Sequence, residues 1–315
     1  MNIDYTSLSE IPCPVCGVTA YSIVTKRFDG GRIVRCTACQ HIYLNPVLND
    51  SMLDVIYADY HLSNDDAITM SRIDGWYANP DGPYQHALML VERCGGFAAK
   101  RVLEIGSGPG RFLYTCRERG AQVTGLDIGA HSIRLAKKYF DLDLLPLSLE
   151  AFLAQKIFAD TKFDLVFAFE LIEHVRYPSE LMRMIYDVLT PGGMVIFSTP
   201  NFGLYAVMRN SAPAVRNWHE HLHFFDAATL AQLMRRQRFD IVSLATVSPL
   251  LPEERQRQQL VASREAMALW QRVKNIGLIR RAKEQVFKLL SRRHDSAELT
   301  AQVGVALFCV GRRAA

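Results

Sequence analysis

A glycine-rich turn directly after an apolar strand restricts the fold of this chain more than any other feature. Val102–Ile105 has the pattern of a buried strand, and Gly106, Gly108 and Gly110 follow it. Glycine at such a turn lets a ligand approach the backbone closely at the end of a sheet. The dinucleotide-binding fingerprint needs glycine where this chain has Arg111, and the Gly-Lys-Ser/Thr of a P-loop is absent. The turn therefore predicts an α/β domain whose ligand is neither NAD nor ATP.

Strand and helix patterns alternate from residue 100 onward, which predicts a mostly parallel sheet with helices on both faces. A helix, Gln85–Cys94, leads into this region. The predicted strands are Arg101–Ile105, Gln122–Asp127, Asp143–Leu147, Phe163–Phe169, Met194–Ser198, Ile241–Val247 and Val303–Val310. A length of 315 residues favours about two domains.

Charge is distributed unevenly along a chain of ordinary globular composition. The net charge is +4, but residues 252–295 hold 11 Lys or Arg against 5 Asp or Glu, a local net of +6. We consider three interpretations of this basic insert: a lid over a ligand pocket, transient contact with a membrane surface, and contact with RNA. No apolar run approaches ~18 residues and no secretory signal is evident, so we expect a cytoplasmic protein.

Four cysteines near the N-terminus form two C-x-x-C pairs, Cys13 with Cys16 and Cys36 with Cys39. Two such pairs close a tetrahedron of thiolates, which suits a structural Zn²⁺ ion without an open coordination position. The intervening segment predicts a β-hairpin of Tyr21–Thr25 and Arg32–Arg35. The segment therefore predicts a zinc ribbon, with His41 as a spare ligand.

Four sequence runs occur in the order VLEIGSGPG, GLDI, FDLVFAFELIEHV and LTPGGMVIFSTPN, and together they resemble the class I S-adenosylmethionine-dependent methyltransferases. The resemblance covers about Gln85–Val247 and the last strand. It implies a Rossmann-like seven-stranded sheet whose last strand is antiparallel, preceded by the zinc ribbon and carrying a helical insert. The expected division is a ribbon in 1–47, a linker with helices in 48–95, and a methyltransferase domain in 96–315 with its insert at 250–298.

The resemblance also implies which residues bind S-adenosylmethionine. The glycine turn would face the methionine part, with Glu104 near its amino group, and Asp127 would hold the ribose hydroxyls. Ile128, Leu149 and Glu150 would border the adenine, and Phe169 and Glu170 would lie beside the sulfonium. The expected cofactor-binding residues are Glu104, Gly106, Ser107, Gly108, Gly110, Asp127, Ile128, Leu149, Glu150, Phe169 and Glu170.

Two histidine-bearing segments are candidates for the acceptor side. Glu170, Glu173 and His174 follow the fourth strand, and His219 and His221 belong to a later His-Glu-His-Leu-His run. We expect Glu173, His174, His219 and His221 to be the catalytic residues. Three roles stay open: binding of Mg²⁺, Mn²⁺ or Fe²⁺, proton abstraction by a histidine, and helix capping and packing, with Asp226 as the expected N-cap of the helix after the second segment. Similar arrangements occur in ubiquinone-pathway O-methyltransferases and in small-RNA 2′-O-methyltransferases, which implies a metal that binds vicinal acceptor oxygens.

The leading hypothesis is a methyltransferase acting on an oxygen of a sugar-like or natural-product small molecule. The pattern CPxCG, RCxxC and YLNP is shared with enzymes of polysaccharide and natural-product clusters, and here it ends at Asn45-Pro46. The alternatives are an RNA methyltransferase, a sugar C-methyltransferase, and a binding protein with an inactive domain. The predicted ribbon has few cations, which weighs against a nucleic-acid partner. None of these sequence features predicts the oligomeric state.

Overall fold

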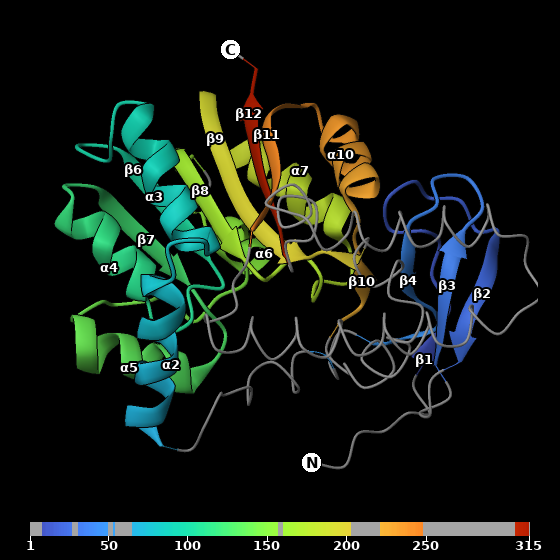
Figure 1. The fold of residues 1–315 in the computed structure, drawn as a ribbon, viewed down its shortest axis with the longest axis horizontal. Helices are drawn as coiled ribbons and strands as arrows, with labels where there is room; N and C mark the ends of the chain where they lie inside the picture. Colours follow the sequence, from blue (N-terminus) through green and yellow to red (C-terminus); the bar gives the residue numbers. More distant parts are fainter. Residues whose placement is uncertain are drawn as a thin grey trace, which may run out of the picture.

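The computed structural model describes residues 8–26, 31–49, 53, 65–156, 160–202, 221–247 and 306–314. A six-stranded mixed sheet forms the centre of the larger part of the molecule, and a smaller sheet lies beside it (Figure 1). The strands of the large sheet, in spatial order, are β11 (Phe239–Val247), β12 (Ala306–Arg313), β9 (Leu189–Pro200), β8 (Phe163–Phe169), β6 (Arg101–Ile105) and β7 (Gln122–Leu126).

The direction of the strands confirms the predicted class I topology. Strands β7, β6, β8 and β9 are parallel to their neighbours, whereas β12 runs antiparallel between β9 and β11. Five of the seven predicted strands appear as strands with bounds that differ by a few residues, and the last predicted strand is described from Ala306 onward. The carboxyl ends of β6, β7 and β8 therefore meet at one edge, where a ligand binds in folds of this kind.

The predicted strand Asp143–Leu147 was wrong. Only Leu145 joins the sheet, through an isolated parallel bridge to Leu126. The amide of Leu145 donates to Gly125 O at 2.9 Å, and the amide of Asp127 donates to Leu145 O at 3.1 Å. The next amide that could donate to β7 is Leu147 N, but it donates back to Leu145 O at 2.8 Å, so the chain turns away and the ladder ends.

Helices cover both faces of the large sheet. They are α2 (Asp66–Ala78), α3 (Pro83–Arg93), α4 (Arg111–Glu118), α5 (Ala130–Phe140), α6 (Leu149–Ala154), α7 (Pro178–Val188) and α10 (Ala227–Arg236). Side chains of α3, α4 and α5 are buried with one face, and those of α6, α7 and α10 with the other. Neighbouring strand residues such as Val166 and Phe167 alternate between the two clusters, as the period of a strand requires. The predicted N-cap Asp226 is confirmed, because its carboxylate accepts from Thr229 N at 2.7 Å.

The N-terminal segment forms the predicted hairpin and two further strand contacts. Strands β2 (Tyr21–Lys26), β3 (Arg32–Cys36) and β4 (Ile42–Leu44) are antiparallel, and β4 also pairs with β10 (His223–Phe224) from the larger part of the chain. Short strands β1 (Leu8–Ser9) and β5 (Val47–Leu48) pair below them. Ribbon side chains belong to the same buried cluster as α6, α7 and α10. The ribbon therefore packs against the side of the larger part that α7 and α10 cover.

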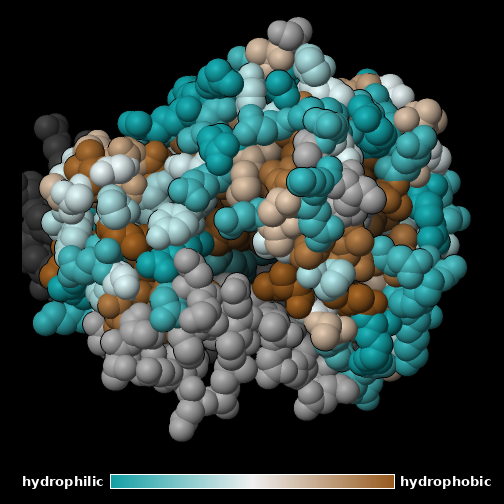
Figure 2. Space-filling model, turned by 180° about the vertical axis from the view of Figure 1, so that it is seen from behind, coloured by the Kyte–Doolittle hydropathy of each residue, from teal (hydrophilic) through white to brown (hydrophobic). Residues whose placement is uncertain are grey.

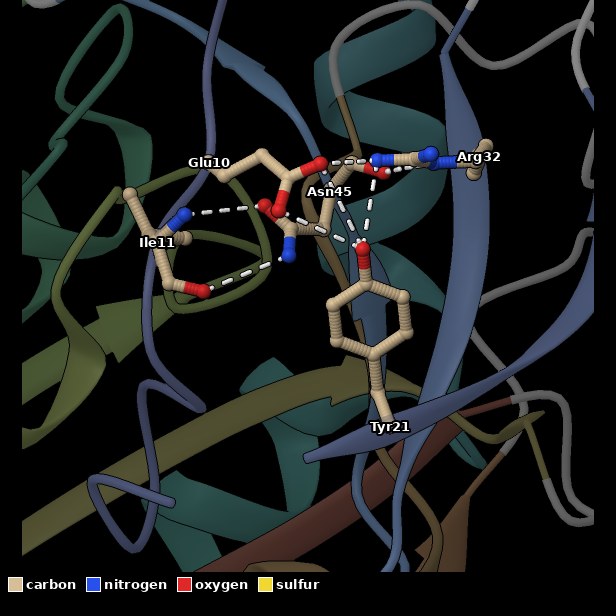
Figure 3. Close-up of polar contacts among 5 residues, drawn as sticks. All are labelled: Glu10, Ile11, Tyr21, Arg32 and Asn45. Carbon is tan, nitrogen blue, oxygen red and sulfur yellow. Dashed lines mark hydrogen bonds and ion pairs between the residues drawn. The ribbon is translucent and has the colours of Figure 1, made fainter. Parts of the chain in front are cut away.

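Asn45, the polar residue of the Tyr-Leu-Asn-Pro run, fastens the end of β4 to the segment after β1 (Figure 3). Its side chain is buried; Oδ1 accepts from Ile11 N at 2.9 Å, and Nδ2 donates to Ile11 O at 3.3 Å. Beside it, Arg32 Nε donates to Asn45 O at 3.3 Å and Arg32 also pairs with Glu10. The hydroxyl of Tyr21 completes this polar network. The amide of Asn45 thus substitutes for a strand partner of Ile11.

The surface of the described residues is largely polar. Figure 2 shows the molecule from behind, where hydrophilic side chains cover much of the view and hydrophobic ones gather in its lower right part. In the described part of the chain, no helix is both long and apolar enough to cross a membrane. The basic insert at 250–298 lies outside the described residues, and so does most of the linker segment between residues 50 and 64.

We predict that Asn45→Ala destabilises the N-terminal module. The substitution leaves the amide of Ile11 without its side-chain partner in a buried place, which costs about 1–3 kcal/mol. Urea unfolding should show this loss. Tyr21→Phe is the matched control, because its hydroxyl lies in the exposed part of the same network and its loss should cost under ~0.5 kcal/mol. Equal losses in both variants would contradict the bracing role of Asn45.

Candidate functional site

A pocket opens beside the glycine turn, between the sheet edge and the helices α2 and α3. Its lining includes Glu104 at the end of β6, the backbone of 106–109, and Phe169 at the end of β8. Tyr77 of α2 and Tyr84 of α3 close its other side. The full lining consists of Ile73, Tyr77, Tyr84, Glu104, Gly106, Ser107, Gly108, Pro109, Arg111, Phe112 and Phe169. The predicted glycine turn and the predicted strand ends therefore meet at one cavity.

The glycine turn depends on positions that other residues would strain. Gly108 has φ +52° with open space where a Cβ would stand, and Gly110 has φ +77° with Leu142 Cδ1 only 2.8 Å from that place. Asp127 holds the turn, because Oδ2 accepts from Gly108 N at 2.7 Å and Oδ1 accepts from Gly129 N at 2.8 Å. The backbone at Gly108 is thus open to a ligand and fixed to the end of β7.

Two of the predicted cofactor residues are turned into the protein. The hydroxyl of Ser107 donates to Glu104 O at 2.9 Å and approaches Leu126 O at 3.2 Å, so it links the ends of β6 and β7. Leu149 is buried in the core at the start of α6, whereas Glu150 beside it is exposed. Ile128 is 39% exposed just after Asp127. Ile128, Leu149 and Glu150 do not line the pocket at the glycine turn.

Two acidic side chains, the buried Glu104 and the half-buried Asp127, lie beside the glycine turn. Glu104 is 3% exposed, and its Oε2 has no hydrogen-bond partner among the described residues. Burial, and then the charge of Asp127, hold the pKa of Glu104 well above its ordinary value. Burial also raises the pKa of Asp127, although the amides of Gly129 and Gly108 oppose that shift. Among the described residues, no Lys or Arg forms an ion pair with either carboxyl, and a positively charged ligand would supply the missing cation.

Two more buried carboxyls follow β8. Burial raises the pKa of Glu170 to about 7, and Ser198 Oγ donates to its Oε1 at 2.6 Å. Burial and the charge of Glu170 hold the pKa of Glu173 well above its ordinary value. Thr199 Oγ1 donates to Glu173 Oε2 at 2.8 Å, while Oε1 has no hydrogen-bond partner in the part of the chain that is described.

Three predicted acceptor-side residues lie together. Glu173, His174 and His221 offer ligand atoms within 4.8 Å of one another. The rings of His174 and His221 are 4.7 Å apart at 78°, and His174 Nε2 lies 3.7 Å from Glu173 Oε1. Burial, and then His174, lower the pKa of His221 to about 3, so this imidazole is neutral at physiological pH. Glu170 is not in this group, and His219 lies outside the described residues.

The aromatic wall of the pocket was missed by sequence reasoning. Tyr84 contacts Phe169 with ring centroids 4.7 Å apart, and Arg111 lies over the Tyr77 ring at 4.0 Å. Arg111 Nε also donates to Asp74 of α2 at 2.9 Å. Tyr77 and Tyr84 belong to the segment 48–95, for which the sequence predicts a linker with helices and no role in binding.

The four N-terminal cysteines form a second cluster on the ribbon. The Sγ atoms of Cys13 and Cys39 are 3.5 Å apart, and so are those of Cys16 and Cys36. All four sulfurs lie within 4.8 Å of one another. A tetrahedral zinc with bonds of about 2.3 Å needs sulfurs about 3.8 Å apart, so the cluster fits such an ion. His41 is not in this group, because its Nε2 lies 3.2 Å from His223 Nδ1.

Comparison with known proteins gives the same fold and chemistry. Residues 84–244 match a family described as "Methyltransferase domain". A ubiquinone biosynthesis O-methyltransferase of Nitrosospira multiformis is 30% identical over 175 residues, which are 51% of this chain and 71% of the relative. The protein of the same name from Chromobacterium violaceum is 28% identical over 169 residues, which are 50% of this chain and 72% of that relative.

A solved structure shows similarity over a larger part of the chain. It is a chain of the complex between the Haloferax volcanii Trm112 methyltransferase activator and a methyltransferase, with a TM-score of 0.52 and 15% identity. The alignment covers 85% of this chain and all of that one. At this identity the likeness concerns the fold alone.

We predict that Glu104→Gln stabilises the protein at neutral pH in the absence of cofactor. Because burial raises the pKa of Glu104, the folded protein holds a proton that the unfolded chain releases above about pH 4.5. That contribution to stability is therefore lost as pH rises from about 4.5 toward the raised pKa. In thermal unfolding between pH 4 and 8, the melting temperature of Glu104→Gln relative to that of the wild type should rise as the pH increases.

Glu118→Gln serves as the control for this experiment, because its carboxylate is 56% exposed and should leave the pH dependence unchanged. If the melting temperatures of wild type and Glu104→Gln depend on pH in the same way, ionisation of Glu104 costs the folded protein no stability, and the prediction is wrong.

Proposed function

The chain belongs to the methyltransferase-domain family and is an S-adenosylmethionine-dependent enzyme, and from this premise we propose that it methylates a hydroxyl group of a small molecule. The class of acceptor that we favour is a sugar-like or natural-product compound with neighbouring oxygens. The relatives named as ubiquinone biosynthesis O-methyltransferases support a small-molecule oxygen acceptor.

The observation that carries the proposal is the set of uncompensated carboxyls around the pocket. S-adenosylmethionine has an ammonium group and a sulfonium centre, both cationic, and phosphate-rich cofactors carry the opposite charge. Glu104, with its unpartnered Oε2, lines the cavity together with Gly106 and Gly108. A cation placed there offsets the cost of burying the carboxylate. A glycine turn with this charge suits S-adenosylmethionine and repels nucleotide phosphates.

We assign roles within this pocket residue by residue. Glu104 binds the ammonium group, and the backbone of Gly106, Gly108 and Gly110 faces the methionine part. Asp127 accepts hydrogen bonds from the ribose hydroxyls through lone pairs left over by Gly108 N and Gly129 N. Ile128 and Glu150, which lie outside the lining of this pocket, would border the adenine, whereas the buried Leu149 packs in the core behind them, and Phe169 and Glu170 adjoin the reacting methyl group.

The cluster of Glu173, His174 and His221 is the proposed acceptor site. Its two imidazoles and one carboxylate suit a divalent ion such as Mn²⁺ or Mg²⁺, which would bind and acidify neighbouring hydroxyls. The alternative is that a neutral histidine takes the hydroxyl proton directly. In both cases the enzyme holds the acceptor oxygen in line with the methyl group, and proximity provides much of the rate.

We propose that the ribbon holds one structural Zn²⁺ ion through Cys13, Cys16, Cys36 and Cys39. The sulfur separations and burial support this assignment. A site with four thiolates has no open position, so the ion stabilises the fold and takes no part in methyl transfer.

We predict that Asp127→Ala weakens S-adenosylmethionine binding at least roughly tenfold. Each hydrogen bond to a charged group contributes about 1.5–3 kcal/mol, and a tenfold change corresponds to about 1.4 kcal/mol. Isothermal calorimetry with S-adenosylmethionine gives the measurement. Asp143→Ala is the control, because its carboxylate is 84% exposed and it lies two residues before the bridge at Leu145, away from the glycine turn. An unchanged affinity in a folded Asp127→Ala protein would refute the ribose-binding role.

Methyl transfer from labelled S-adenosylmethionine should identify the acceptor class and the role of the histidines. We expect label in small compounds with neighbouring hydroxyls, such as a catechol, and less in the matched monohydroxy compound. Label found in RNA alone would contradict the proposal. His174→Ala and His221→Ala should each lower kcat by about 10²–10⁴ while cofactor affinity stays within about twofold.

Chelation separates the two roles of the cluster. If it binds a divalent ion, EDTA abolishes turnover and Mn²⁺ or Mg²⁺ restores it, while metal analysis still finds zinc on the ribbon. If a histidine is the base, turnover survives EDTA. Turnover near the wild-type value in both alanine variants would show that the cluster is structural.

A further inference from the structure

The segment 221–225 is bound from both sides, by the ribbon and by the loop after β8. On the ribbon side, Leu44 N donates to Leu222 O at 2.8 Å, and β10 pairs with β4 through His223 opposite Tyr43. Figure 1 shows β10 lying beside the ribbon sheet. Among the described residues, β4 of the ribbon is the only strand that pairs with β10.

The other side of the same segment is attached to the candidate acceptor site. Leu222 N and His223 N both donate to Glu173 O, at 2.8 and 3.1 Å. The side chains of Glu173 and His221 belong to the acceptor cluster described above. The backbone next to His221 is therefore held between ribbon strand β4 and Glu173, and the side chains of His221 and Glu173 lie in the same cluster.

A buried pair of histidines makes a second connection between ribbon and acceptor loop. His41 and His223 are both almost fully buried. His223 Nε2 lies 2.8 Å from Val175 O, which can only accept, so this nitrogen carries the proton. Burial disfavours a charged imidazole, and Nδ1 of His223 therefore accepts from His41 Nε2 at 3.2 Å. The chain of hydrogen bonds runs from the ribbon to the loop that follows His174.

The cysteine cluster in turn fixes His41. Cys36 N donates to His41 O at 2.9 Å, and Gln232 Nε2 of α10 donates to Cys39 O at 3.4 Å. The first cysteine turn is docked as well, because Ser179 Oγ at the start of α7 donates to Pro14 O at 2.5 Å. Both turns that carry the cysteines are therefore held against helices of the catalytic domain.

We propose that the cysteine module positions His221 in the acceptor site, and that His41 and His223 are the positioning residues through which it acts. This inference rests on the proposed function only in calling the Glu173, His174 and His221 cluster the acceptor site. The pocket beside the glycine turn is built from α2, α3, β6, α4 and β8, without any ribbon residue. Loosening the ribbon should therefore disturb the acceptor side and spare the cofactor side.

The test uses the full-length protein with three substitutions. His41→Phe keeps a ring against Phe225, whose centroid lies 4.6 Å away, but removes the donor to His223. His41→Gln restores a donor at a similar position. Tyr43→Phe is the control on the same module, because the buried Tyr43 hydroxyl has no hydrogen-bond partner among the described residues. Removing an unpartnered hydroxyl should be close to neutral.

Two readouts are independent of the methyl acceptor. In protein labelled with ¹⁵N-histidine, His41→Phe should shift or broaden the imidazole signal of His221, which is assigned by its loss in His221→Gln. Hydrogen exchange of a peptide that contains residues 221–225 should become about tenfold faster or more, because a buried acceptor loses its partner. Calorimetry with S-adenosylhomocysteine should give an affinity within about twofold of wild type. His41→Gln should recover part of both changes, and Tyr43→Phe should show neither.

An unmoved His221 signal with faster exchange confined to ribbon peptides would overturn the proposal, since the ribbon would then be a separate stabilising module. If His41→Phe does not fold, the double substitution Ser179→Ala and Gln232→Ala loosens the docked cysteine turns instead. The same shift of His221 is expected there, and its absence counts against the proposal. Failure of the proposed function would look different: the His221 signal would move as predicted, but no small hydroxyl compound would be methylated.

Discussion

Buried carboxyl groups at the carboxyl edge of the sheet are the constraint on which the rest of the site depends. Glu104, Asp127, Glu170 and Glu173 lie at the ends of β6, β7 and β8, and burial raises the pKa of each. Such a set costs stability unless a cation or a proton is supplied. A methyl donor that carries two cationic centres meets this need. In the proposed site, this acidity is the feature that would favour S-adenosylmethionine over a phosphate-bearing cofactor.

The ribbon is packed against the larger part of the molecule and is not a separate module. Its residues share a buried cluster with α6, α7 and α10, and β4 pairs with β10 directly after His221. Asn45 holds the ribbon's own strands together through the backbone of Ile11. In our proposal, the side with the glycine turn binds the methyl donor, and the ribbon positions the side where the acceptor would lie.

The sequence was sufficient for features that local chemistry dictates. The glycine turn, the sheet topology, the ribbon hairpin and the N-cap Asp226 were all predicted and are confirmed. The prediction of a strand at Asp143–Leu147 failed because Leu147 N donates back to Leu145 O, a local turn that the strand pattern did not indicate. Predictions also fell short where a contact joins distant segments: the β4–β10 pair and the place of Tyr84 in the pocket have no local signature. Which residues touch the cofactor stays a prediction.

The measurement that tests the account most directly is a crystal structure with S-adenosylhomocysteine and zinc. The account predicts the amino group of the ligand at Glu104, its ribose at Asp127, and its sulfur directed toward Glu173, His174 and His221. It also predicts that segment 221–225 stays paired with β4. A ligand bound elsewhere, or a sulfur that faces away from the histidine cluster, would contradict the account.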